Sequence, residues 1–443
     1  MDEFLFDAAG QQRLLDYFDR IGAVLGDASR RASYAVYAMG LLGDGDRKSM
    51  EPISARAAPD TGRVTAQHQR LQHFITDSPW SDREVRRAAA LHGIEALTTR
   101  ESITHWIVDD TGFLKQGSHS VGVKRQYTGS AGKVTNCQVA VSLSVATPTN
   151  HLPIDFELYL PRDWTDDEAR RKEARIPDEV VFKTKLELAL DMADRALADG
   201  IVPGMVLVDT AYGNSSRFRR ALRQRGFSYG VAVKSTTKVW SLDKLERRTG
   251  GRTMTVSEYA NQIVARGGFR RTTWREGTKS SMSARFAARR VLPIADEGVP
   301  RAERDIVWLL MEWEDGEKAP NKFHFITAPE HVTKKWLVRQ VKQRWRTERA
   351  YEDMKGQLGL DHFEGRRYPG WHHHVSAVLS CYAFIVAEHA RLFPPEAGRA
   401  HRDRADRLAA RASLRRLLPH HSTRHRPRHC HLAPAMPVLP SRQ

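Results

Sequence analysis

The order of apolar patterns between residues 106 and 233 constrains the fold of this 443-residue chain more than any other feature. Apolar and polar residues alternate along 137–145 and again along 154–160, which is the period-two pattern of antiparallel β-strands. A helical stripe follows at 181–199, and Met205–Val208 is a short apolar run typical of a strand buried on both faces. The other expected elements are a first strand, a basic helix and a last strand, at 106–110, 215–226 and 229–233. This order predicts an α/β fold, a mixed sheet with helices on both faces.

The segments on either side of this region predict further domains. The first 98 residues have helical patterns, and Ser81 with Glu84 three residues later is a typical helix start. Short strands and glycine pairs predict a β-rich insertion, and a long basic helix is expected from about Val332 to Gln357. The expected divisions are a helical N-terminal module, the first part of the core, the insertion, the final part of the core and a disordered Arg/His/Pro-rich tail, at 1–98, 99–235, 236–320, 321–398 and 399–443.

The net charge of +17 indicates a polyanionic partner. The tail from residue 399 contributes nine of these charges through 11 Arg against two Asp, so the body of the chain is only moderately basic. Three widely separated cysteines do not suggest a disulfide framework. No run approaches the roughly 20 apolar residues of a membrane span, and no secretion signal is expected at the N-terminus. These features predict a cytoplasmic protein without a membrane partner.

Three acidic residues stand in contexts that fit one metal site. Asp110 closes the apolar run from Trp106, Asp209 closes Met205–Val208, and Glu348 lies in the long basic helix. Carboxylates are hard oxygen ligands suited to Mg²⁺, and two such ions can clamp the attacking and leaving oxygens of a phosphodiester. Asp109 competes with Asp110, because neighbouring residues of a strand point to opposite faces. The acidic residues therefore predict an enzyme that cuts and rejoins DNA.

Three motifs give the chain a family resemblance. They are Asp109-Asp110-Thr111-Gly112-Phe113, Val208-Asp209-Thr210-Ala211-Tyr212-Gly213, and the segment from Arg344 through Glu348 and Lys355 to Arg366. Over residues 25–390 the chain resembles DDE-type insertion-sequence transposases, from the branch with a β-rich insertion before the catalytic Glu. The third family pattern is Tyr, two residues, Arg, three residues, Glu, six residues, Lys. Arg344, Glu348 and Lys355 satisfy it and share one helix face at 100° per residue, whereas Val341 occupies the tyrosine position.

The resemblance implies a ribonuclease H-like fold and metal-dependent cut-and-paste DNA transposition. The residues it assigns to catalysis and metal binding are Asp110, Asp209 and Glu348, because the family's Asp-Thr pairing favours Asp110 over Asp109. Two Mg²⁺ ions are implied, with Mn²⁺ as a substitute. The implied partner is double-stranded DNA, at element ends and target, bound by a homodimer with the helical module as a DNA-binding domain. The expected DNA contacts are Arg344, Lys355, Lys124, Arg125 and Tyr127.

Other functions and roles remain open at this point. The chain could be a ribonuclease H-like metal nuclease that cuts without joining, or a non-catalytic DNA-binding relative of a transposase. Glu352 is expected to pair with Arg349 or Lys355 rather than to bind metal. Core packing is the expected role of the insertion tryptophans, with base stacking as the alternative. Successive residues on a helix diverge by 100°, so the run from His372 to His374, even with Cys430, does not predict a zinc site.

Overall fold

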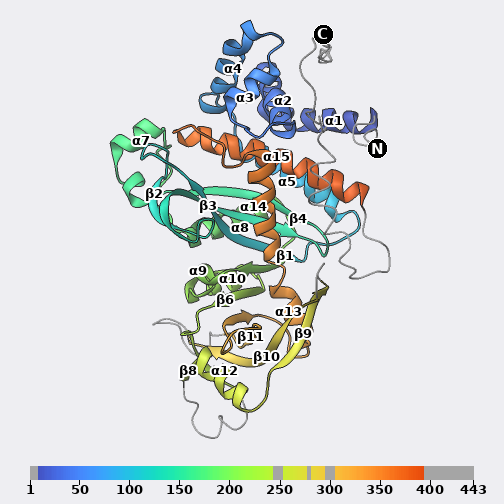
Figure 1. Cartoon of the computed structure of the whole chain (residues 1–443), viewed down its shortest axis with the longest axis vertical. Coiled ribbons are helices and arrows are strands. Elements are labelled where there is room, and N and C mark those ends of the chain that lie inside the picture. The colour runs from blue at the N-terminus through green and yellow to red at the C-terminus, as the bar shows by residue number, and fades with distance from the viewer. Residues whose placement is uncertain (1–7, 243–252, 277–280, 295–304, 394–443) are drawn as a thin grey trace.

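The computed structural model describes residues 8–242, 253–276, 281–294 and 305–393, so the predicted tail and Cys430 lie outside the described residues. Helices account for the N-terminal region as predicted, and α5 begins at the cap Ser81, whose side chain accepts from the Glu84 N–H. The α-helices are α1 (Ala8–Leu25), α2 (Ala28–Leu42), α3 (Met50–Ala57), α4 (Val64–Thr76) and α5 (Asp82–Thr98). In Figure 1, α1–α4 form one end of the molecule, and α5 lies beside α15 against the sheet.

The core sheet has the predicted strand order. Its elements are β1 (His105–Leu114), β2 (Lys124–Thr128), β3 (Lys133–Ala146), β4 (His151–Tyr159), α6 (Arg162–Thr165), α7 (Glu168–Ala174), α8 (Lys185–Ala198), β5 (Met205–Val208), α9 (Thr210–Gly213), α10 (Ser216–Gln224) and β6 (Tyr229–Val233). Strand β1 is antiparallel to β3 and parallel to β5, and β5 is parallel to β6. Both β2 and β4 pair with β3. This mixed sheet confirms the predicted ribonuclease H-like α/β fold.

The β-rich insertion continues the core sheet instead of forming a separate one. It comprises β7 (Lys238–Ser241), β8 (Thr253–Thr255), α12 (Val256–Ala265), β9 (Arg270–Glu276), β10 (Ser281–Pro293) and β11 (Val307–Trp313), followed by β12 (Lys322–Ile326). Strand β12 is antiparallel to both β6 and β11 and so joins the two parts. The resulting order is β2-β3-β1-β5-β6-β12-β11-β10-β7-β8. The predicted short strands lie within β10 and β11.

The single long helix predicted near residues 332–357 is two helices, α13 (Lys334–Val341) and α14 (Trp345–Leu358). Two separate apolar clusters explain the break. Leu337 and Val338 on α13 pack into a cluster with the insertion strands, whereas Tyr351 and Met354 on α14 pack into the main core. A single straight helix could not direct the apolar residues of both halves into these two separate clusters, so the chain breaks between α13 and α14. Figure 1 shows α14 running from α15 across the sheet toward β1.

Helix α15 (Tyr368–Leu392) is the central helix of the main core. Among the described residues it alone has the length and apolar composition to span a membrane, but 78% of its apolar window is buried inside the protein. It packs closely on α5, and α5 in turn lies against β4. Gly93 allows that approach, because a Cβ there would lie 2.5 Å from Leu152 Cδ2. The apolar length of α15 therefore reflects burial on all sides within the fold.

A buried guanidinium fastens the helical region to the core. Arg86 of α5 is 3% exposed, and its nitrogens lie 2.5 Å from Asp82 Oδ2 and 2.8 Å from Asp155 Oδ1 of β4. It also donates to Ser376 Oγ of α15 at 3.0 Å. Burial works to lower the pKa of Arg86, but Asp82, Asp155 and Glu157 hold it above its usual value. One cation thus ties three elements that are far apart in sequence.

Candidate active site

The register of β1 and β5 brings two aspartates to one face of the sheet. The two strands are parallel, with Ile107 paired to Leu207. Paired residues of parallel strands point to the same face and every second residue returns to it, so Asp109 and Asp209 share the face of this pair. Asp209 lies just beyond β5 as the N-cap of α9, where its Oδ1 accepts from the backbone N–H groups of Ala211 at 2.9 Å and Tyr212 at 3.3 Å.

Helix α14 adds a third carboxylate and a cation to this face. Arg344 donates from Nη1 to Asp109 Oδ2 at 2.5 Å and from Nη2 to Glu348 Oε1 at 2.8 Å. Its guanidinium therefore lies between the carboxylates of β1 and α14. Asp109 is nearly buried, whereas the Glu348 side chain is 59% exposed, so the cluster is open to solvent on the side of α14. The predicted one-turn relation of Arg344 and Glu348 is present.

Crowding and burial disturb the titration of this cluster. Burial raises the pKa of Asp109 to about 7; the Arg344 charge opposes this rise, and the Asp209 carboxylate adds to it. Burial also raises the pKa of Asp209, again opposed by Arg344, and the Asp110 carboxylate adds to the rise. Burial works to lower the pKa of Arg344, but Asp109, Glu348 and Asp209 raise it. Carboxylates brought together in this way need a positive charge, which Arg344 supplies in the structure.

Asp110, which the sequence favoured, points to the opposite face of β1. Its Oδ2 accepts from Lys185 Nζ of α8 at 3.0 Å and from the Tyr212 hydroxyl at 3.3 Å. The pleat of the strand is the physical reason, since adjacent side chains diverge. The structure therefore separates Asp110 from the face of Arg344 and Glu348 and brings Asp109 there instead. The Asp-Thr pairing of the motif does not indicate on which face of β1 each aspartate lies.

Lys355 forms hydrogen bonds within the protein. Its ammonium donates to Thr111 Oγ1 at 2.8 Å and to the Gly112 carbonyl at 2.7 Å, with Ser130 Oγ at 3.4 Å. Thr111 shares the β1 face of Asp109, so Lys355 ties the Glu348 helix to the strand of the first carboxylate. The sequence predicted a DNA contact for this lysine, but in the structure its hydrogen bonds hold two site elements together.

The predicted DNA contacts after the first motif lie on β2. β2 pairs with the start of β3, near the end of β1. Lys124 and Arg125 are exposed, and Lys124 Nζ lies 2.8 Å from Asp163 Oδ2. Tyr127 is 62% exposed. These three side chains are available to a partner, and their DNA contact stays a prediction.

Several secondary predictions also have an outcome. Glu352 pairs with Arg349 at 3.4 Å, one of the two partners expected for it. The insertion tryptophans Trp274 and Trp308 pack against the buried cluster of the insertion. His373 is buried, and its two ring nitrogens are in hydrogen-bond contact with the backbone carbonyls of Ile75 and Trp80. All of these side chains lie outside the carboxylate cluster.

The sequence alone did not identify the side chains that position the carboxylates through hydrogen bonds and packing. Tyr351 of α14 lies in hydrogen-bond contact with Ser142 Oγ at 2.5 Å, and Asp109 is the charge that most raises the pKa of Tyr351 after burial. Lys185 and Tyr212 fix Asp110, as described above. Tyr212 stands three residues after Asp209 in the second motif, which was the available signal. Ser142 and Lys185 carry no motif, and only the fold brings them here.

The donor set fits a divalent cation chemically, although the side chains are not arranged around one. Asp109 and Asp209 offer hard carboxylate oxygens on one face, and burial is the main cause of their raised pKa values, to which neighbouring carboxylates add. Within the described parts of the chain, no three Asp, Glu, His or Cys side chains converge as metal ligands. Arg344 stands between Asp109 and Glu348, so this guanidinium occupies the space that a shared ion would need.

Comparison with known proteins identifies the family of the chain. A family model described as DDE superfamily endonuclease matches residues 20–281, and one described as Transposase DDE domain matches residues 181–384. Over 198 residues the chain is 31% identical to the "Probable transposase for insertion sequence element IS701" of Microchaete diplosiphon, covering 44% of this chain and 47% of that protein. The aligned part thus spans about half the length of that relative. The chain belongs to the DDE superfamily of endonucleases, and its resemblance to insertion-sequence transposases is confirmed.

Proposed function

We propose that this protein is an insertion-sequence transposase that cleaves DNA at the element ends and joins the freed 3′ ends to target DNA. The observation that carries the proposal is the cluster of Asp109, Asp209 and Glu348 around Arg344, in a chain of the DDE superfamily. The substrate would be double-stranded DNA bound by a homodimer. The cofactor would be Mg²⁺, as two ions for which Mn²⁺ could substitute.

Each residue of the cluster has a role in this proposal. Asp109 and Asp209 would hold the ions from the sheet, and Glu348 would complete the set from α14, with Asp110 as the alternative to Asp109. Bound divalent ions would stabilise the charge that develops on the phosphoryl oxygens. Arg344 neutralises the carboxylates before the ions bind and afterwards can donate to a DNA phosphate. Lys355 keeps α14 at its distance from β1.

The direct test of this function is a cleavage and strand-transfer assay. The substrate would be a plasmid carrying the DNA that flanks the gene on both sides, incubated with the protein and Mg²⁺. A transposase gives cleaved ends and joined products, and neither forms with EDTA. Cleavage without joining would indicate the metal nuclease of the same fold. Metal-independent binding without any cleavage would indicate a non-catalytic DNA-binding relative.

We expect the affinity for a divalent cation to depend on pH between 6 and 8. The pKa of Asp109 is raised to about 7, so protons compete with the ion below that value. Affinity for Ca²⁺ at pH 6 should be about tenfold weaker than at pH 8, because only about a tenth of the Asp109 carboxyl is ionised at pH 6. Isothermal titration calorimetry measures this change.

The control for that titration is Asp353→Asn. Burial raises the pKa of Asp353 to about 6, and this carboxyl pairs with Arg349 away from the cluster. The substitution should leave the pH dependence of Ca²⁺ affinity in place. An affinity that does not change between pH 6 and pH 8 would contradict the assignment of Asp109 as an ion ligand.

A further inference from the structure

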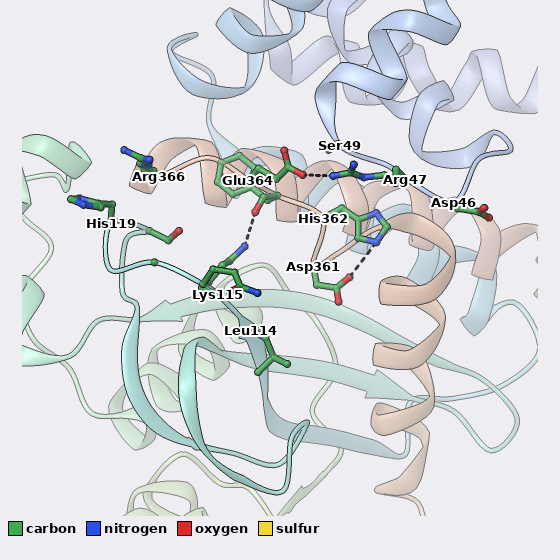
Figure 2. A pocket seen from close by; sticks show the side chains of 14 residues that line it. Asp46, Arg47, Ser49, Leu114, Lys115, His119, Asp361, His362, Glu364 and Arg366 are labelled. Carbon is green, nitrogen blue, oxygen red and sulfur yellow. Dashed lines mark hydrogen bonds and ion pairs between the residues drawn. The ribbon is translucent and has the colours of Figure 1, made fainter.

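A polar pocket of about 500 Å³ lies outside the carboxylate cluster, where three parts of the chain meet. One wall is the loop between α2 and α3 in the helical region, at Asp46–Ser49. The second is the segment that follows β1, from Leu114 to Ser120, and the third is the α14–α15 connection, from Asp361 to Arg366. In Figure 2, Arg47 is turned toward Glu364 and Lys115 toward the α14–α15 connection, whereas Arg366 lies on the other side and is turned away from Arg47. The pocket is thus a junction between the helical region and the core.

Strand β1, which carries Asp109, and helix α14, which carries Glu348, both lead into this pocket. From Asp109 to Lys115 the chain advances six residues, which is about 20 Å at roughly 3.3 Å per strand residue. From Glu348 helix α14 runs ten residues further to Leu358, about 15 Å at roughly 1.5 Å per helical residue, and a turn at Gly359 then leads to Asp361. DNA held by the helical region and reaching the carboxylates would pass along this line.

Hydrogen bonds fix the walls of the pocket in place. The Lys48 backbone N–H donates to His362 Nδ1 at 3.0 Å, so the other ring nitrogen, Nε2, carries the proton and is a donor. Lys115 Nζ donates to the Phe363 carbonyl at 2.6 Å. The Val121 N–H donates to the Arg366 carbonyl at 3.1 Å. Because the walls are already ordered, a ligand would lose little free energy in arranging them.

Two arginines give the pocket its recognition chemistry. Arg366 is exposed, and no hydrogen bond to its guanidinium is found within the described residues. Arg47 pairs with Glu364 at 2.9 Å, and the two side chains are 73% and 65% exposed. Such exposed pairs are worth about 0–1 kcal/mol, so Arg47 can exchange its partner readily. A guanidinium offers paired N–H donors that match the oxygens of a phosphate.

We propose that this pocket is a subsite for the phosphate backbone of duplex DNA, on the path between the helical region and the carboxylates. Arg366 and Arg47, on different sides of the pocket, each donate to phosphodiester oxygens of that backbone, and Arg47 leaves Glu364 to do so. Glu364 therefore opposes DNA binding when DNA is absent, because it occupies Arg47. This inference rests on the proposed function and names a contact that DNA makes about 20 Å from the site of cleavage.

The test is DNA affinity of the full chain, measured by fluorescence anisotropy with a labelled random-sequence duplex of about 30 base pairs at several NaCl concentrations. Arg366→Gln should weaken binding several-fold and reduce the slope of log affinity against log salt by about one. Arg366→Lys should keep most of that slope. Glu364→Gln should strengthen binding, because it frees Arg47. Each change should exceed that of the same charge removed elsewhere on the surface, because loss of any Arg weakens DNA binding and loss of any acidic side chain strengthens it to some extent.

The controls are Arg271→Gln and Asp315→Asn. These residues form an exposed pair of the same kind at 2.9 Å in the insertion, and they report the effect of one charge anywhere on the surface. The subsite is overturned when the pocket variants change affinity no more than these controls while the wild-type protein binds DNA. A wild-type protein without salt-dependent binding to any duplex would instead overturn the proposed function.

Discussion

Asp109→Asn should abolish metal-dependent DNA cleavage, whereas Asp110→Asn should leave a measurable rate. Asp109 shares its face with Asp209 and pairs with Arg344, while Asp110 points away toward Lys185. Ligands that act as a unit are each nearly indispensable, so the loss at Asp109 should be at least about a hundredfold. Asp110 holds the Tyr212 hydroxyl and with it the turn that carries Asp209, so its loss should be partial.

The measurement is the initial rate of cleavage in Mg²⁺, with circular dichroism to show that each variant is folded. Asp209→Asn and Glu348→Gln should match Asp109→Asn in severity. Glu352→Gln is the matched control, since Glu352 is one turn along the same helix and pairs with Arg349. Equal losses from Asp109→Asn and Asp110→Asn in folded proteins would mean that the register alone does not identify the first carboxylate.

Arg86→Ala should cause the largest loss of stability of any single change described. The substitution leaves the partly buried Asp82 without its cation, and it leaves the buried Asp155 paired with Arg195 alone. Removing one partner of a buried ion pair costs about 3–5 kcal/mol in the free energy of unfolding. The midpoint of urea unfolding, followed by tryptophan fluorescence, should therefore fall clearly below that of the wild-type protein.

Arg20→Ala is the control for that experiment. Arg20 pairs with Glu95 at 3.0 Å, but the two side chains are 45% and 69% exposed. Exposed pairs contribute about 0–1 kcal/mol, so the unfolding midpoint should hardly move. Similar midpoints for Arg86→Ala and Arg20→Ala would show that the buried guanidinium does not hold α5 to β4 and α15.

The sequence was sufficient for the fold because its patterns are local. Alternation along β3 and β4 and the buried run at β5 each report which faces of a strand are covered, and their order specifies a ribonuclease H-like sheet. Which of Asp109 and Asp110 shares a face with Asp209 is not local information, and the catalytic role of either residue stays a prediction. The shared face depends on the pairing of Ile107 with Leu207, two residues a hundred positions apart, so neither segment alone reveals it.

The helix that carries Glu348 shows the same limit. Helical spacing correctly put Arg344 and Glu348 one turn apart. It could not reveal the break between α13 and α14, because that break arises from two apolar clusters that form only in the folded protein. Nor could it reveal that Lys355 faces oxygens of β1 at hydrogen-bond distance. Charge and spacing identify a candidate cation, and tertiary contacts decide whether the cation is free.

The central claim is that the carboxylates on the face shared by β1, β5 and α14 hold the catalytic ions. Anomalous diffraction from crystals soaked in Mn²⁺ tests this most directly, because it locates the metal independently of activity. We expect an anomalous peak bounded by Asp109 and Asp209, with Glu348 turned toward it and Arg344 displaced from its position between Asp109 and Glu348. A peak at Asp110 beside Lys185, with none on the opposite face of β1, would contradict the account.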